Sequence, residues 1–318
     1  MPEYFDKSGS TNGSKYDACP MTQPGGNVPI RAVFGGQTDV GLKRKHNEDH
    51  ILVRVDLGLF VLADGMGGHN AGDVASKLAT SSLAGFFEEM RGQTYFGVPP
   101  PDFQHLEVDA LRLYFGLVKA NEDVHRVSAE DGAHQGMGST IVVAFLTRDG
   151  RVHIGHVGDS RCYRVCGGDI ELLTHDHSFV NDVLRAQPDL LPEQVAHLPH
   201  NIITRALGMR PDVEPTIRTE PTVPGDVFVL CSDGLSGQVD REEILRIVGD
   251  GRDPQQACSD LVDASNDAGG KDNVSVIVVR IDESQPRMSF PPAPTCTRCG
   301  SANFAEAATC QRCGSPMS

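Results

Sequence analysis

The sequence predicts an α+β fold built in layers, and three observations support this. Short runs rich in Val and Ile, bounded by Gly or Asp, are typical of β-strands. Short turns between them, such as the Arg-Asp-Gly turn at 148–150, favour antiparallel hairpins over β-α-β crossovers. Helical periodicity is confined to separate segments, and helices segregated from hairpins are typical of α+β domains.

The expected elements follow one another between residues 30 and 281, which we expect to form one domain. The expected strands are Ile51–Val55, Leu59–Ala63, Thr140–Leu146, Val152–His156, Val227–Cys231 and Val274–Val279. Apolar residues at helical spacing predict helices around Val74–Phe86, from Ala110 to Val124 and around Cys258–Ala264.

The flanks of this domain have a different composition. Residues 1–29 are rich in Gly, Ser, Asn and Pro without an apolar period, so we expect a disordered tail that cannot offset its ordering entropy. Residues 282–295 contain four prolines and predict a semi-rigid linker. A small cysteine-rich module at 296–318 follows the linker.

The charge balance and the hydropathy exclude some functions. The 43 acidic residues against 28 basic ones give a formal charge of −15, which disfavours nonspecific nucleic-acid binding and suits a site that concentrates divalent cations. No apolar run is long enough for a membrane helix, and the polar N-terminus lacks a signal core. We therefore expect a soluble, cytoplasmic protein that does not bind membranes.

Aspartates recur at the ends of the expected strands. Asp64, Asp159 and Asp233 each end an apolar run and precede Gly or Ser, and Asp272 lies just before the last strand. Any one of these is most simply interpreted as a turn. Together, they are expected to converge at one edge of a sheet, where they repel one another unless cations lie between them. Oxygen ligands suit Mg²⁺ or Mn²⁺, and two such ions can activate water for attack at phosphorus.

A charged segment near the N-terminal end of the domain adds three candidate residues. Arg44 lies four residues before the acidic pair Glu48 and Asp49. An arginine can present a forked donor to phosphate oxygens while the acids orient water. A solvated charged turn is the alternative interpretation.

The order of the motifs resembles a known family. The segments RKHNED, LADGMGGH, GMGST, VGDSR, LTHDHS, ITRALG, CSDGLSG and GGKDNVSVIVV occur in this order between residues 44 and 279, as in the bacterial form of the protein phosphatase 2C (PPM) family. The resemblance implies a four-layer α-β-β-α sandwich of two antiparallel sheets flanked by helices. It also implies hydrolysis of phosphoserine and phosphothreonine in proteins at a binuclear Mg²⁺/Mn²⁺ centre.

The resemblance assigns metal-binding roles to individual residues. Asp64 would bridge both ions, and the carbonyl of Gly65 would bind one of them. Asp233 and Asp272 would complete the other site. Asp159, together with Asp233, would offer a third, weaker metal position.

The resemblance also assigns the residues around the substrate. Arg44 would hold the phosphate, while Glu48 and Asp49 would bind or orient metal waters. Met66 replaces a histidine that many eukaryotic members carry, a change that bacterial members commonly share. His69 or a metal-bound water then remains as the donor of the leaving-group proton.

Other conspicuous residues have structural interpretations. Thr174, Asp176 and Ser178 resemble capping and turn residues before a helix. The stretch from Phe179 to Arg205 corresponds to a variable flap beside the active site in relatives. Asn273 is expected to fix the turn that aims Asp272.

Four of the nine cysteines lie in the C-terminal module. Two CxxCG knuckles predict a zinc ribbon that needs structural Zn²⁺ to fold, with two redox-type pairs as the alternative. The expected zinc ligands are Cys296, Cys299, Cys310 and Cys313. Because its charge is close to neutral, we expect the ribbon to dock a protein partner rather than a nucleic acid.

The phosphatase hypothesis has one main competitor, a catalytically silent scaffold that binds phosphoproteins and recruits partners through the ribbon. The presence of the metal aspartates disfavours it. Cysteine-phosphate and aspartyl-phosphate mechanisms are disfavoured because no Cys is followed six positions later by Arg and no Asp-x-Asp pair occurs. We expect a monomeric enzyme that acts on phosphorylated proteins.

Overall fold

The computed structural model describes residues 30–67, 71–199, 202–249 and 251–283, together with Arg298, Ser315 and Pro316. The chain divides into two compact units, residues 1–282 and 283–318. The expected disordered tail, most of the linker and the four zinc cysteines lie outside the described residues. Those expectations therefore stay predictions.

The strands form two sheets, and their pairs are antiparallel wherever the register is defined. The first sheet contains, in spatial order, β1 (Ile30–Asp39), β11 (Val274–Glu283), β10 (Val227–Cys231), β7 (Arg161–Cys166) and β8 (Asp169–Leu172). The second contains β2 (Asp49–Arg54), β3 (Leu59–Met66), β5 (Ile141–Leu146), β6 (Arg151–Val157) and β9 (Thr216–Pro221), with β4 (Gly138–Ser139) paired to β3.

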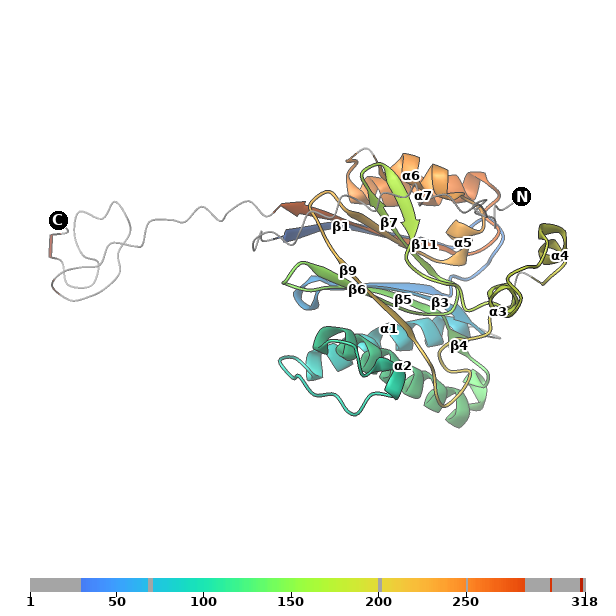
Figure 1. Ribbon diagram of the computed structural model, residues 1–318, viewed down its shortest axis with the longest axis horizontal. Coiled ribbons are helices and arrows are strands. Elements are labelled where there is room, and N and C mark those ends of the chain that lie inside the picture. The colour runs from blue at the N-terminus through green and yellow to red at the C-terminus, as the bar shows by residue number, and fades with distance from the viewer. Residues whose placement is uncertain are drawn as a thin grey trace. The chain divides into compact units, whose positions relative to one another are not determined.

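Helices cover the outer face of each sheet (Figure 1). Helices α1 (Ala71–Glu89) and α2 (Val108–Glu130) lie on the second sheet, and α5 (Asp233–Ser236), α6 (Arg241–Val248) and α7 (Pro254–Asp267) lie on the first. Along the chain, helices α3 (Phe179–Ala186) and α4 (Pro192–Ala196) connect β8 to β9. Short 3-10 helices occupy Val55–Leu57, Pro101–Phe103 and Gly132–His134.

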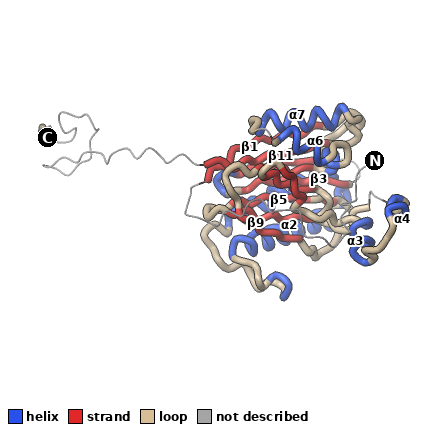
Figure 2. The backbone as a smooth tube through the Cα atoms, turned by 45° about the horizontal axis from the view of Figure 1, so that its top comes forward, coloured by secondary structure: helices blue, strands red, loops and turns tan. Residues whose placement is uncertain are grey.

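The alternation of side chains along the strands produces the four layers. In β3, Leu59, Val61 and Ala63 pack against the helices, whereas Phe60 and Leu62 pack between the sheets. Strand β10 alternates in the same way, so three buried cores hold the layers together. Each fully buried side chain of this size contributes roughly 1.5–3 kcal/mol of hydrophobic stabilisation. Figure 2 shows the strands stacked between the outer helices.

The expected layered α+β fold and its antiparallel sheets are confirmed. All the expected strands and helices are present, with limits that differ at their ends: Val55 belongs to a 3-10 helix, and the last strand continues to Glu283. Strands β1, β4, β7, β8 and β9 and helices α4 to α6 were not among the expected elements, whereas α3 is the helix expected after Ser178. In the described part of the chain, no helix is long and apolar enough to cross a membrane.

Candidate active site

Five aspartates meet at one end of the sandwich, and we refer to them as the carboxylate cluster. Asp49 at the start of β2 lies opposite Asp64 near the end of β3. Asp233 lies two residues after the end of β10, and Asp272 lies two residues before β11, the antiparallel neighbour of β10. Asp159 lies in the connection between β6 and β7. The expectation of a single sheet edge is therefore wrong, because both sheets contribute.

The carboxylate cluster is electrostatically unfavourable when no cation is bound. Burial and the charges of Asp49, Asp233, Asp159 and Asp272 raise the pKa of Asp64 well above its usual range. This set of interactions shows that the five side chains are near one another. Mutual repulsion of this kind is the usual sign of a site that takes up cations.

Three other members of the carboxylate cluster, Asp49, Asp159 and Asp233, have raised pKa values as well. Burial raises the pKa of Asp49 to about 6 and that of Asp159 to about 7, and in both groups the charge of Asp233 adds to the effect. Asp233 reaches solvent at the mouth of the cluster. Protein atoms nevertheless crowd its carboxyl group, and this desolvation, followed by the charge of Asp272, raises its pKa.

Asp49 has an unused ligand atom. Its residue is 5% exposed, and its Oδ2 accepts a hydrogen bond from Ser232 Oγ at 2.9 Å. Its Oδ1 is buried and has no hydrogen-bond partner among the residues that the structure describes. A buried carboxylate oxygen without a partner costs free energy, so this atom fits a bound cation or its water.

Hydroxyl groups hold the backbone of Asp64 in place. Thr140 Oγ1 accepts from the Asp64 amide at 3.1 Å and lies 2.7 Å from Ser160 Oγ. Ser139 Oγ donates to the Asp64 carbonyl at 3.0 Å. Sequence reasoning gave these hydroxyls no role, although Ser139 and Thr140 end the GMGST motif. Their burial in the β4–β5 segment is visible only in the fold.

Gly65 is required by packing rather than by a turn. Asp64 and Gly65 lie inside strand β3, so the turn interpretation is wrong at this site. A Cβ atom on Gly65 would lie 2.0 Å from the carbonyl oxygen of Gly72 in α1. The turn interpretation is also wrong at Asp233, which begins α5.

The charged segment before β2 contributes two further groups. Arg44 Nη2 lies 2.6 Å from Asp272 Oδ2, and this hydrogen bond raises the pKa of the guanidinium. About half of the Arg44 side chain is exposed. The carboxylate of Glu48 lies against Gly72, at the positive end of α1, next to Gly65. A purely solvated charged turn therefore does not describe Arg44, because its guanidinium contacts a member of the carboxylate cluster.

The donor set fits hydrated Mg²⁺ or Mn²⁺ because every candidate ligand atom is an oxygen. Within the described ranges, no three His, Cys, Asp or Glu side chains form a ready-made cage for one ion. This agrees with the coordination habits of Mg²⁺, which keeps several waters and usually takes only one or two carboxylates. The unpartnered Asp49 oxygen and the raised pKa values nevertheless favour cations at this site.

The motif before the flap has three different functions. Ser178 caps α3 by accepting from the Asn181 amide at 3.4 Å, so the capping interpretation is confirmed there. It is wrong for Asp176, which forms a buried ion pair with Arg161 at 2.7 Å. It is also wrong for Thr174, whose hydroxyl accepts from the Cys162 amide at 3.2 Å.

The expected flap between Phe179 and Arg205 contains α3 and α4. Met66 ends β3 and pairs with Gly138. His69, considered as a proton donor, lies outside the described residues.

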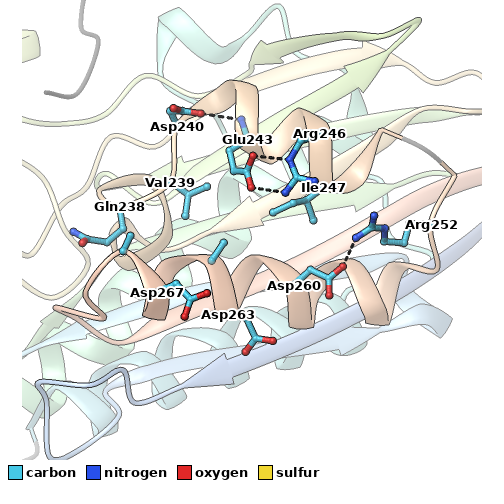
Figure 3. A pocket seen from close by; sticks show the side chains of 12 residues that line it. Gln238, Val239, Asp240, Glu243, Arg246, Ile247, Arg252, Asp260, Asp263 and Asp267 are labelled. Carbon is cyan, nitrogen blue, oxygen red and sulfur yellow. Dashed lines mark hydrogen bonds and ion pairs between the residues drawn. The ribbon is translucent and has the colours of Figure 1, made fainter.

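A cavity of about 480 Å³ lies elsewhere, between α6 and α7 (Figure 3). Glu243 and Arg246 of α6 line one side, and Asp260 and Asp263 of α7 line the other. No member of the carboxylate cluster lines it. This cavity is therefore separate from the candidate active site.

Comparisons with known proteins agree with the fold and the site. Residues 43–264 match the family model for protein phosphatase 2C. The chain is 36% identical over 252 residues to protein phosphatase PhpP of Streptococcus pneumoniae, which covers 77% of this chain and 96% of that protein. It is 32% identical over 254 residues to the serine/threonine phosphatase stp of Listeria monocytogenes, with coverage of 78% and 96%.

Solved structures are similar over the same region. The serine/threonine phosphatase PstP/Ppp of Mycobacterium tuberculosis is 30% identical with a TM-score of 0.67, covering 80% of this chain and 99% of that one. The catalytic domain of PstP in complex with two manganese ions is 31% identical with a TM-score of 0.65 and the same coverage. The chain therefore belongs to the protein phosphatase 2C family and is a metal-dependent protein serine/threonine phosphatase.

Proposed function

We propose that the carboxylate cluster binds two Mn²⁺ or Mg²⁺ ions and that the chain uses them to hydrolyse phosphoserine and phosphothreonine in phosphorylated proteins. The observation that carries the proposal is the position of Asp64, whose carboxyl group interacts with all four other aspartates. The manganese-bound catalytic domain of PstP supports the choice of metal.

We assign the metal ligands as follows. Asp64 would hold both ions, the carbonyl of Gly65 would hold one of them, and Asp233 with Asp272 would hold the other. Asp159 provides a third, weaker position with Asp233. When bound, such ions lower the pKa of coordinated water and offset charge on the phosphoryl oxygens.

The remaining residues bind the substrate and orient water. Arg44 has a half-exposed guanidinium beside Asp272, so its free N–H groups can donate to two phosphate oxygens. Asp49, with one oxygen fixed by Ser232 and the other without a partner, can accept a hydrogen bond from water. Glu48 is held at the start of α1, next to Gly65, where it can orient a second water.

A direct assay tests the proposal. Purified protein with Mn²⁺ is expected to hydrolyse phosphoserine and phosphothreonine peptides and an aryl phosphate, and EDTA or Asp233→Ala should abolish both activities. Hydrolysis of neither substrate would contradict the proposal. Calorimetric titration with Mn²⁺ then separates an enzyme, which binds two ions at the cluster, from a silent scaffold, which need not.

We propose the domain limits that the sequence suggests: a tail over 1–29, the phosphatase domain over 30–281, a linker over 282–295 and a zinc ribbon over 296–318. The duplicated CxxCG spacing supports a ribbon that docks a protein partner. The full chain is expected to contain one zinc ion. Cys296→Ser with Cys313→Ser should remove that ion and leave hydrolysis of the aryl phosphate intact.

A further inference from the structure

The loop that carries Arg44, residues 40–48, packs against the segment before β11. We call it the arginine loop. The amides of Leu42 and Lys43 both donate to the carbonyl oxygen of Gly270, at 2.8 and 3.1 Å. No strand or helix includes this loop, so its position depends on such individual contacts.

Asn273 holds both ends of the arginine loop. Its residue is 6% exposed, and every polar atom of its side chain is used. Nδ2 donates to the carbonyl oxygens of Val40 at 3.0 Å and His46 at 2.9 Å. Oδ1 accepts from the amide of Glu48 at 2.9 Å. One side chain therefore fixes the loop before and after Arg44.

Asn273 also touches the metal side of the site. Its backbone amide donates to Asp272 Oδ1 at 2.8 Å, and Arg44 Nη2 bonds the other oxygen of the same carboxylate at 2.6 Å. The backbone amide of Asn273 thus orients Asp272, a candidate metal ligand. The side chain of Asn273 fixes the conformation of the arginine loop, which carries the candidate phosphate-binding residue.

We propose that Asn273 is a positioning residue that couples the arginine loop to the Asp272 carboxylate, so that Arg44 meets the phosphate in register with the metal centre. The proposal rests on the function proposed above for Arg44. Removing the side chain would leave two carbonyls and one amide without partners in a loop that has little structure of its own. The loop would then move, and displacements of about 1 Å at such groups can cost ~10²-fold in rate.

The fold contains a matched control for this residue. Asn121 in α2 is 1% exposed, and its Nδ2 donates to the carbonyl oxygens of Arg210 at 3.1 Å and Pro211 at 3.0 Å. Its Oδ1 accepts from the amide of Gly208 at 2.9 Å. Asn121 therefore makes the same three kinds of bond to a different loop.

The experiment uses the full chain with saturating Mn²⁺ and compares Asn273→Ala, Asn121→Ala, Arg44→Ala and the double variant Arg44→Ala/Asn273→Ala. The readouts are the inhibition constant of inorganic phosphate, kcat/KM for an aryl phosphate, Mn²⁺ affinity by calorimetry and Tm. Asn273→Ala should weaken phosphate inhibition and lower kcat/KM by about 10–100-fold, which is typical for a group that orients active-site residues. Asn121→Ala should lower Tm to a similar extent and leave phosphate inhibition unchanged.

The double variant distinguishes positioning from a general structural effect. If Asn273 acts through the arginine loop, removing it from Arg44→Ala should cause little further loss of phosphate binding. An equal loss in both backgrounds would overturn the proposal, as would wild-type phosphate inhibition in Asn273→Ala. Asn273→Ser, a smaller polar replacement, is tested in parallel in case the alanine variant does not fold, and the same outcomes apply to it.

Failure of the underlying function would look different. If Arg44→Ala itself binds phosphate like the wild type, the role proposed for Arg44 is wrong, and so is a coupling that depends on it. If Arg44→Ala weakens phosphate binding and Asn273→Ala does not, the role of Arg44 stands and only the positioning role of Asn273 is wrong.

Discussion

This protein has two acidic regions, the carboxylate cluster and the cavity between α6 and α7. The pKa values of their carboxyl groups are shifted in opposite directions. In the cavity, Glu243 bonds Arg246 at 2.5 and 2.7 Å, and Asp260 bonds Arg252 (Figure 3). The hydrogen bond from Arg246 lowers the pKa of Glu243. In the carboxylate cluster, burial and neighbouring aspartates raise the pKa values instead.

This contrast indicates that the carboxylate cluster, and not the cavity, needs a bound cation to balance its charge. The cavity supplies its own arginines, so these carboxylates are ionised and stable without a ligand. Among the described residues, the ion pair of the carboxylate cluster joins Arg44 to Asp272. Asp64 interacts with the four other carboxyl groups, and Asp49 accepts a hydrogen bond from Ser232 and lies near the charge of Asp233. Unbalanced charge, rather than acidity or cavity volume, therefore distinguishes the candidate active site from the cavity.

The largest expected effect is the loss of activity when the centre of the carboxylate cluster is neutralised. Asp64→Asn should lower kcat by at least ~10³-fold, because several kcal/mol of charge stabilisation depend on the bound ions. The same change removes a repelled charge, so the metal-free variant should melt about 2–4 °C above the wild type, as ~1 kcal/mol predicts. Assays with an aryl phosphate and calorimetric melting in EDTA measure both effects. If Asp64→Asn has a lower Tm than the wild type when both are free of metal, repulsion among the aspartates does not destabilise the fold.

The next effect is stabilisation by the metal itself. At about 100 times the dissociation constant, Mn²⁺ should stabilise the wild type by ~2.7 kcal/mol, which corresponds to a rise in Tm of about 5–10 °C. Asp233→Ala should lose most of this shift, whereas Asp263→Asn in the cavity should keep it. An equal Mn²⁺-dependent shift in Asp233→Ala would place the ions elsewhere.

The two regions should also respond oppositely to acid when metal is removed. The pKa of Asp159 is about 7 in the fold and about 3.9 in an unfolded chain, so the folded state binds the proton first. This group should therefore add stability as the pH falls from 7 to 5, on the order of 2 kcal/mol. Burial also raises the pKa of Asp49, so it adds to the same gain. Urea unfolding in EDTA at both pH values should show the gain in the wild type and a gain smaller by the contribution of Asp159 in Asp159→Asn.

The cavity provides the control for that measurement. Hydrogen bonds from Gln256 and Arg252 lower the pKa of Asp260, so its contribution is present above the unfolded pKa and is lost only as the pH falls below it. Between pH 7 and pH 5, the free energy of unfolding of Asp260→Asn should consequently change by the same amount as that of the wild type. A loss of the pH response in this variant would contradict the assignment to Asp159.

The sequence was most informative where strands are buried on both faces. Runs such as Val227–Cys231 are continuous and apolar because helices cover one face and the other sheet covers the second. Strands β7 and β9 were missed because they carry Arg161, Arg164 and Arg218, whose ion pairs with acids of other segments make the runs look like loops. Only the folded chain reveals those partners.

The aspartates of the carboxylate cluster were predictable from the sequence, but their geometry was not. Aspartates at strand ends are visible in the sequence, and the motif order gave their roles as expectations. The bonds of Asn273 to Val40, His46 and Glu48 span more than 220 positions, and no local pattern reports them. For the same reason, only the tertiary structure shows that the carboxylates come from two sheets instead of one.

The smallest expected effect comes from the cavity. The Arg252–Asp260 pair is roughly one-third exposed on both sides, and pairs of this kind contribute about 0.2–1 kcal/mol to stability. Arg252→Gln should lower the free energy of unfolding by that amount, and most of the difference should vanish in 1 M NaCl, where the screening length falls to ~3 Å. Activity on phosphopeptides and on the aryl phosphate should stay at the wild-type level, since no member of the carboxylate cluster lines the cavity. A fall in kcat with this variant would mean that the two acidic regions are coupled, and the contrast between them would fail.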